Sequence, residues 1–282
     1  MVIGIVAVLA AIISAIVCAA WGAFGGLAWL WMLPVWWLVS FLGIILLTFL
    51  MVLIMCRFVD IEKEEQEDNP FYRAVLYVIA DAAHTVLQVR VHAEGLEKVP
   101  TEGRVMLVCN HLDNVDPVII MHQVKKMQTL AFIAKRETAT MFVVGKFMHK
   151  ILCQRINREN DREALKTILK CIDILKKDKA SIAVFPEGGI KGGNVLHPFR
   201  HGVFKIAQRA RVPIVVCTLW GTQNIIHNGL RLKPTDVDFH VLGVVQPDEI
   251  DGLTAVEVGQ MVHGMMAKDL GPDRVLFVEE TP

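Results

Sequence analysis

The first 56 residues form an apolar leader unlike the rest of the chain. Residues 1–56 contain no Lys, Arg, Asp or Glu, and they are long enough for two helices of the roughly 20 apolar residues that cross a bilayer core. Five of the six tryptophans lie between residues 21 and 37, together with three glycines and Pro34. Indole rings favour the lipid headgroup region, and Gly and Pro interrupt helices. We therefore predict membrane helices near 2–20 and 38–56, joined by an interfacial turn at 21–37.

A cleaved signal peptide is the alternative for this leader. No Lys or Arg precedes the apolar run, Val17 stands before Cys18 where a lipoprotein signal needs a small residue, and a second apolar span follows directly. These features favour a retained hairpin. Arg57 is its only flanking cation, so the positive-inside rule says little about orientation. We expect the remaining chain on the cytoplasmic side. The six cysteines, two of them in the leader, show no clustering and no C-x-x-C spacing, so reduced thiols are the simple interpretation.

The polar part of the chain begins with an acidic stretch. The run at 60–68 is typical of a solvated linker, and the apolar positions of residues 71–87 predict a helix that lies on a membrane surface or covers the core. We therefore divide the chain into a hairpin (1–56), an acidic linker with an amphipathic helix (57–87) and a catalytic domain (88–282).

Short apolar runs alternate with amphipathic stretches through residues 88–282. The predicted strands are Gln88–His92, Arg104–Cys109, Thr129–Ala134, Ser181–Phe185, Ile214–Trp220 and Val237–Val245. The predicted helices are Pro117–Val124, Thr140–Lys150, Asp161–Lys177, Gly202–Ala210 and Ala255–Lys268. This alternation indicates an α/β fold, with one mixed, largely parallel sheet flanked by helices.

The composition of the chain indicates a membrane-associated protein and shows one region rich in cations. An apolar content of 54% and a mean hydropathy of +0.45 are too high for a purely soluble enzyme, and the zero net charge gives no argument for nucleic acid. Residues 135–179, however, hold twelve cations and six acids. Such a stretch suits a phosphorylated ligand or an anionic lipid surface. Most of these charges are expected on the solvent-exposed face of the predicted helix at 161–177. Arg155 and Arg158, which precede this helix, are therefore the better ligand candidates.

The first candidate site follows the predicted strand that ends at Cys109. His111 stands at the carboxyl end of that strand, where α/β folds place ligands, and an imidazole there can serve as a general base. Asp116, five residues on, can bind the other ring nitrogen and select the tautomer. Alternatively, Asp116 caps a helix that starts at Pro117. Two such ligands without a third nearby do not indicate a metal site.

The second candidate site, Phe185-Pro186-Glu187-Gly188-Gly189, also follows an apolar strand. A glycine-rich turn exposes backbone N–H groups that can bind a phosphate, and Lys191 follows closely. An ordinary tight turn is the alternative. No G-x-S-x-G, Walker A or G-x-G-x-x-G motif is present, which argues against a serine hydrolase, nucleotide hydrolysis and dinucleotide redox chemistry. Cys109 lies two residues before His111, so a cysteine nucleophile is geometrically conceivable, although a buried apolar thiol is commoner.

Taken in order, these blocks resemble the lysophospholipid acyltransferases of the 1-acyl-glycerol-3-phosphate acyltransferase type. The blocks are N-H-x₄-D (Asn110–Asp116), the arginine block around Arg155, F-P-E-G (Phe185–Gly188) and V-P-I-V (Val212–Val215). Lys135 also stands where that family tends to have a lysine. Four ordered blocks are more specific than any one of them.

The resemblance implies a reaction without a cofactor. His111, oriented by Asp116, would take the proton of a glycerol hydroxyl, and the oxygen would attack the thioester of acyl-CoA or acyl-carrier protein to give phosphatidic acid. The substrate-binding residues it implies are Asn110, Lys135, Arg155, Arg158, Phe185, Pro186, Glu187, Gly188 and Lys191. The implied partners are membrane lipids and a lysophosphatidic acid or related acceptor, and not nucleic acid.

The chain departs from the family pattern after F-P-E-G, where Gly189-Ile190-Lys191 replaces Thr-Arg-Ser. Lys191 can supply the missing charge one position later. This leaves open a different lysolipid or glycerol phosphate as the acceptor. Outside the transferases, a thioesterase that uses Cys109 and His111 and a non-enzymatic lipid-binding scaffold are the alternatives.

Overall fold

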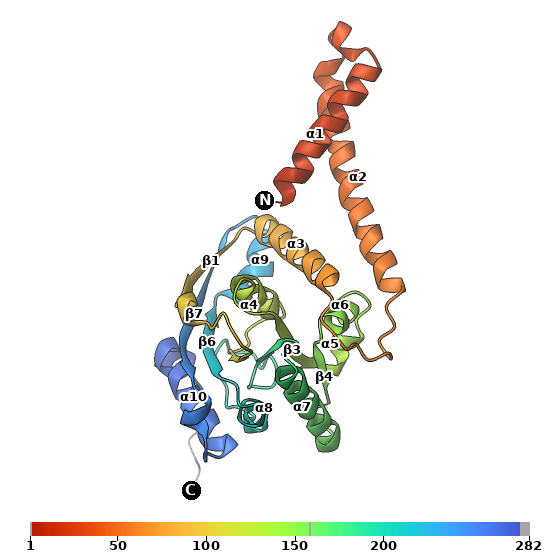
Figure 1. Ribbon diagram of the computed structural model, residues 1–282. Coiled ribbons are helices and arrows are strands. Elements are labelled where there is room, and N and C mark those ends of the chain that lie inside the picture. Colours follow the sequence, from red (N-terminus) through yellow and green to blue (C-terminus); the bar gives the residue numbers. More distant parts are fainter. Residues whose placement is uncertain (1, 158, 277–282) are drawn as a thin grey trace.

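The first two helices form a hairpin that projects from the rest of the molecule. The computed structural model describes residues 2–157 and 159–276. Helices α1 (Val2–Ala20) and α2 (Trp29–Arg57) lie side by side (Figure 1). Both are long and apolar enough to cross a membrane, judged by length and composition.

The turn between α1 and α2 is shorter than predicted, covering residues 21–28 instead of 21–37. Helix α2 begins at Trp29, and Pro34 lies in its second turn. A proline removes only its own N–H bond from the helical ladder, and α2 continues through Pro34 to Arg57. The glycines at the start of the segment make the turn.

Two side-chain hydrogen bonds join the helices of the hairpin. Ser14 Oγ donates to the carbonyl oxygen of Leu33 at 2.7 Å, and Trp37 Nε1 donates to that of Ala7 at 3.0 Å. Polar groups within an apolar hairpin need partners of this kind, because lipid tails provide none.

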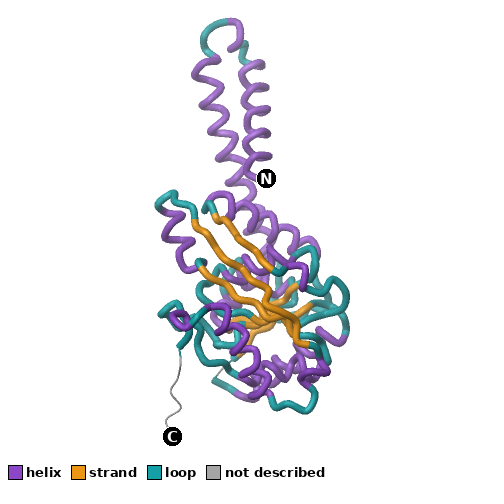
Figure 2. The backbone as a smooth tube through the Cα atoms, turned by 90° about the vertical axis from the view of Figure 1, so that its left-hand side faces the viewer, coloured by secondary structure: helices purple, strands orange, loops and turns teal. Residues whose placement is uncertain are grey.

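A seven-stranded sheet forms the centre of the remaining chain (Figure 2). Its strands are β1 (Val89–Glu94), β2 (Met106–Val108), β3 (Leu130–Lys135), β4 (Gln154–Ile156), β5 (Ser181–Val184), β6 (Ile214–Trp220) and β7 (Thr235–Val245). The spatial order is β1-β7-β6-β2-β5-β3-β4, and only the β6–β7 pair is antiparallel. The predicted mixed, largely parallel sheet is therefore confirmed. Five strands therefore run in the same direction, and their carboxyl ends lie along one side of the sheet: β6, β2, β5, β3 and β4.

Helices cover both faces of this sheet. They are α3 (Pro70–Val86), α4 (Asp116–Val124), α5 (Arg136–Thr140), α6 (Val144–Lys150), α7 (Asp161–Lys176), α8 (Lys205–Ala210), α9 (Ile225–Leu230) and α10 (Ala255–Leu270). Along β2, Met106 and Val108 pack with residues of α7, α8 and α10, whereas Leu107 packs with residues of α3, α4 and α9. This alternation is what a strand buried on both faces requires.

One predicted helix needs correction, and two short elements were not predicted. The segment 140–150 is not one helix, because α5 ends at Thr140 and α6 begins at Val144; Gly145 packs so closely on Ala139 that a Cβ there would meet its carbonyl oxygen. Strand β4 was not predicted, since a three-residue edge strand with a polar sequence shows no apolar run. Helix α9 was not predicted either, because it is short and contains Gly229.

The hairpin is anchored on the α/β part through the end of α2. Val52 and Cys56 are buried against Phe147 of α6 and neighbouring residues of α3. The linker that follows α2, residues 58–69, then crosses the domain and leads into α3, whose first N–H groups are capped by the side chain of Asn69.

Candidate active site

The turn after β2 holds His111 in place through its neighbours. Asn110 is 1% exposed, and its amide exchanges two hydrogen bonds of 2.8 Å with the backbone of Leu219 on β6. Asn110 thus joins the ends of β2 and β6 and positions the turn, and its contact with substrate stays a prediction. The side chain of His111 remains 14% exposed.

Asp116 is fully buried, and one of its oxygens organises the whole turn. Asp116 Oδ2 lies 2.8 Å from His111 Nδ1 and accepts the backbone N–H groups of Leu112 (2.6 Å) and Asp113 (2.9 Å). Asp116 is itself the first residue of α4, whose N-cap is Val115, so the interpretation of Asp116 as a helix cap is wrong. With a proton on Nδ1 shared with the carboxylate, the lone pair of His111 Nε2 is free to accept a proton.

Residues after β5 complete the surroundings of His111. The ring of Phe185 stacks on the imidazole, with centroids 4.0 Å apart and 12° between the ring planes. Glu187 Oε1 accepts the backbone N–H of His111 (2.8 Å), and Oε2 accepts that of His197 (3.0 Å). Phe185 and Glu187 are predicted from the sequence to bind substrate, but their contacts with His111 and the part played by His197 are not predicted. Neither contact leaves a signal in spacing, because the partners are far apart in the chain.

Burial changes the acidity of Glu187. Its side chain is enclosed between the two turns, and the loss of hydration raises its pKa from the ordinary 4.5 to about 7, against the opposing effect of the two N–H groups. The next residue, Gly188, has a φ of +82°, and a Cβ there would lie 2.9 Å from the Arg200 side chain. The backbone conformation thus favours glycine at this position, and a larger residue would also have to displace the Arg200 side chain.

The remaining predicted binding residues lie along the same edge of the sheet. Pro186 is buried and its carbonyl accepts the Arg200 N–H, whereas Lys191 is exposed in the loop after Gly188. Lys135 ends β3 and Arg155 lies on β4, both exposed. Strands are about 4.8 Å apart, so β4 lies about 14 Å from β2. Arg158 is outside the described residues.

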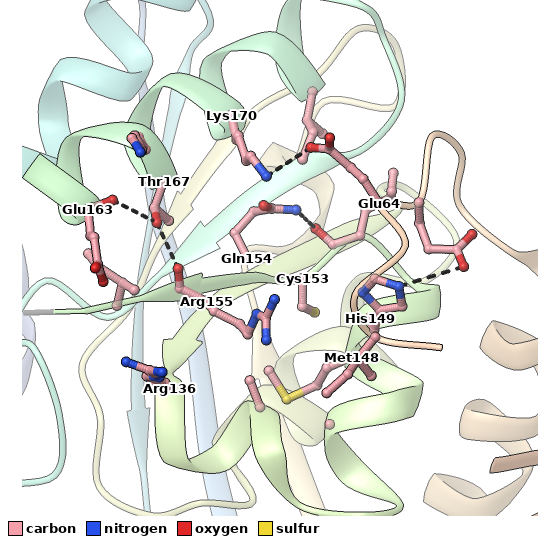
Figure 3. Close-up of a pocket in the computed structure, with 18 of the residues that line it drawn as sticks. Glu64, Arg136, Met148, His149, Cys153, Gln154, Arg155, Glu163, Thr167 and Lys170 are labelled. Atoms are coloured by element: carbon pink, nitrogen blue, oxygen red, sulfur yellow. Dashed lines mark hydrogen bonds and ion pairs between the residues drawn. The ribbon is translucent and has the colours of Figure 1, made fainter. Parts of the chain in front are cut away.

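Arg155 also lines a cavity of about 540 Å³ between β4, α5, α6, α7 and the linker (Figure 3). His111, Glu187 and Lys191 do not line it. The structure therefore brings His111, Asp116 and Glu187 into contact but places Arg155 at the edge strand of the same sheet.

The chemistry open to this arrangement is that of a general base. Burial raises the pKa of Cys109 well above that of an ordinary thiol, and its side chain is fully buried, which disfavours a thiolate nucleophile. Within residues 2–157 and 159–276, no group of three or more His, Cys, Asp or Glu side chains could hold a metal ion. A histidine held by a buried carboxylate can take a proton from a hydroxyl group.

Sequence comparison places this domain among known proteins. Residues 90–220 match the family model described as Acyltransferase. A 1-acyl-sn-glycerol-3-phosphate acyltransferase of Cocos nucifera is 29% identical over 59% of this chain and 54% of that protein. A probable 1-acyl-sn-glycerol-3-phosphate acyltransferase of Mycoplasma pneumoniae is 32% identical over 50% of this chain and 53% of its own length. The match thus spans about half the length of these relatives.

Structural comparison supports the fold. The crystal structure of the 1-acyl-sn-glycerophosphate acyltransferase PlsC from Thermotoga maritima superposes with a TM-score of 0.59 at 24% identity, covering 70% of this chain and 77% of that one. The family model and the relatives confirm the resemblance of this chain to the lysophospholipid acyltransferase family, with the Acyltransferase match at residues 90–220.

Proposed function

We propose that this protein is an O-acyltransferase that moves a fatty acyl group from a thioester to the free hydroxyl of 1-acyl-glycerol-3-phosphate, giving phosphatidic acid. The observation that carries the proposal is the 2.8 Å contact between His111 Nδ1 and Asp116 Oδ2, in a turn at the carboxyl end of a central strand. The names of the relatives, which are 1-acyl-sn-glycerol-3-phosphate acyltransferases, support the choice of acceptor.

His111 acts as the general base of the reaction. Its Nε2 takes the proton of the acceptor hydroxyl, and the resulting oxygen attacks the thioester carbonyl carbon. The C–S bond of the tetrahedral intermediate then breaks, the proton passes from Nε2 to the departing sulfur, and ester and thiol are released. The negative charge of Asp116 stabilises the imidazolium that exists between the two proton transfers. No acyl-enzyme forms.

Phosphate binding falls to the cations at the same sheet edge. Lys191 follows the glycine turn at Gly188. Lys135 is the last residue of β3, and Arg155 lies on β4, the neighbouring strand. Charged groups of this kind bind phosphate strongly, and Arg can do so with two parallel hydrogen bonds. Arg158 belongs to the same proposal by its position in the sequence. A related lysolipid or glycerol phosphate as acceptor remains the alternative within this reaction class.

The donor is acyl-CoA or acyl-carrier protein, and the chain is held at the membrane by α1 and α2, with its α/β part in the cytoplasm. The length and apolar composition of the two helices support the membrane association. An anchored domain meets lipid acceptors where they reside, in the bilayer surface.

The test uses detergent-purified full-length protein with palmitoyl-CoA, following thiol release with and without lysophosphatidate. We expect release that requires the acceptor, with phosphatidate as product, and a loss of about a hundredfold or more in His111→Ala. Thiol release without acceptor would instead identify a thioesterase. Turnover unchanged in His111→Ala, with a folded variant, would contradict the proposed role of His111.

A further inference from the structure

The cavity beside β4 has a wall of unusual charge. Of the lining residues, the α/β part contributes five cationic side chains and two carboxylates: Arg136, Arg155, Lys166, Lys170 and Lys179, with Glu163 and Asp173. The volume of about 540 Å³ is within the range of small-molecule sites.

The two carboxylates of this wall have other partners. Glu163 accepts a hydrogen bond from Asn157 (2.8 Å), and Asp173 pairs with Lys177 on its own helix (2.9 Å). Among the described residues, neither Arg136 nor Arg155 has a carboxylate within ion-pair distance. The wall of the α/β part therefore keeps an excess of positive charge.

The acidic linker lies over this excess charge. Glu64 pairs with Lys170 at 2.8 Å, and the contact lowers the pKa of Glu64 (Figure 3). Glu65 pairs with Lys150 and lies 3.7 Å from His149, and Glu67 lies 3.2 Å from Lys179. The linker thus places carboxylates on cations that belong to α6, α7 and the segment before β5.

The Glu64–Lys170 ion pair is exposed and weak, whereas the Glu65–Lys150 pair is more enclosed, with both side chains 21% exposed. The Glu64 and Lys170 side chains are 61% and 55% exposed, and exposed pairs of this kind contribute little to stability and are screened by salt. A ligand that carries two or more negative charges on one group can therefore displace them at small energetic expense. Glutamine keeps the size of the linker side chains and removes their negative charge, and the cations of the wall belong to other elements.

We propose that this cavity binds the phosphate groups of a substrate, and that two linker carboxylates lie in it when no ligand is bound: Glu64, which pairs with Lys170, and Glu65, which lies beside His149. The proposal rests on the proposed function, because a phosphate bound here lies near the carboxyl ends of the parallel strands, and His111 follows one of these strands. Two sources of phosphate fit this chemistry: the phosphomonoester of the acceptor and the phosphates of a CoA-type donor. The linker competes with either one, and ties ligand entry to the segment that joins the hairpin to the α/β part.

The test is calorimetric titration of full-length protein in detergent, with CoA in one arm and glycerol 3-phosphate in the other. We expect Glu64→Gln to bind about threefold more tightly, and Glu64→Gln/Glu65→Gln about tenfold more tightly, in at least one arm. The wild-type affinity should fall steeply with added salt, and the gain of the double variant should shrink with it. Lys166→Ala/Lys170→Ala should weaken binding by about tenfold in the same arm.

Matched variants separate this effect from a general change in charge. Asp60→Asn removes an acid from the same linker, at a side chain that does not line the cavity, and Lys176→Ala removes a cation from the outer side of α7. Both should bind like the wild type. A gain confined to CoA assigns the cavity to the donor, and a gain confined to glycerol 3-phosphate assigns it to the acceptor.

The proposal is overturned if Glu64→Gln and the double variant, shown to be folded by thermal denaturation, bind both ligands no better than Asp60→Asn. It is equally overturned if the wild type binds neither ligand. Repeating the titrations in His111→Ala keeps the two proposals apart. If the linker variants bind more tightly and His111→Ala is inactive, both proposals are supported. If the linker variants bind more tightly but His111→Ala keeps full turnover, only the proposed function is contradicted.

Discussion

Glu187 Oε1 accepts the backbone N–H of His111 at 2.8 Å, although 76 residues separate the two in the chain. The second oxygen of the same carboxylate accepts the N–H of His197 at 3.0 Å. One buried side chain thus connects the turn that carries the proposed base with the loop that carries Lys191. Displacement of Glu187 would move both sides of the site together.

Replacement of Glu187 by glutamine should therefore reduce both turnover and stability. The amide has one acceptor oxygen, so one of the two N–H groups loses its partner, and a buried unpaired group of this kind costs about 1–3 kcal/mol. We expect a lower melting temperature and a fall in kcat of at least about tenfold, with a smaller change in the KM of the acceptor. Melting and kcat equal to those of the wild type would show that the carboxylate does not hold the turn.

The raised pKa of Glu187 predicts a pH dependence of stability. The folded protein keeps the Glu187 proton up to about pH 7, whereas the unfolded carboxyl loses it near 4.5. The folded state thus binds more protons between these values, so the contribution of Glu187 to stability is present below pH 4.5 and is lost as the pH rises through about 7. Over the full window the loss amounts to about 3 kcal/mol.

Comparison of wild type with Glu187→Gln at about pH 5 and about pH 8 isolates this term, because other groups titrate alike in both. The melting temperature of the wild type should fall more between the two pH values than that of the variant. Parallel shifts in the two proteins would contradict the raised pKa.

Asp116→Asn tests the role of the buried carboxylate beside His111. Asparagine is nearly the same size but carries no charge, so it cannot stabilise the imidazolium and can hold the ring in the wrong tautomer. We expect kcat to fall by about a hundredfold, with the affinity for CoA unchanged in calorimetry. An equal loss of CoA affinity would indicate that the turn has collapsed, and retained kcat would remove Asp116 from the mechanism.

Cys109→Ala distinguishes direct transfer from a thiol nucleophile. The Cys109 side chain is fully buried on the sheet and its pKa is well above normal, so acyl transfer should survive with the rate changed by less than about tenfold. The measurement is phosphatidate formation, with the melting temperature as a control for packing. Complete loss of product in a folded Cys109→Ala would instead favour a covalent thioester intermediate.

Lys191→Ala tests the placement of the acceptor phosphate. Lys191 is exposed in the loop after Gly188, so its removal should not disturb the fold, and it should raise the KM for lysophosphatidate by about fivefold with a smaller change in kcat. Lys176→Ala, on the outer side of α7, is the matched control. A KM that stays the same in Lys191→Ala would place the phosphate elsewhere on the sheet edge.

Local patterns in the sequence were sufficient for the features that depend on near neighbours in the chain. The apolar runs predicted six of the seven strands, and the five-residue spacing of His111 and Asp116 predicted their contact, because a single turn closes it. Asp161–Lys177 was predicted within one residue, since an amphipathic pattern and an Asn cap define that helix locally. The apolar hairpin followed from composition in the same way.

Only the tertiary structure decided which distant segments meet. The contact of Glu187 with His111, the stacking of Phe185 on the imidazole and the position of Arg155 at the edge strand all depend on the strand order β2-β5-β3-β4. The ion pair of Glu64 with Lys170 likewise depends on where the linker crosses α7. Spacing along the chain determines hydrogen bonds within a turn or helix, whereas contacts between remote segments form where the packing of the whole core brings their backbones together, and no local pattern records that.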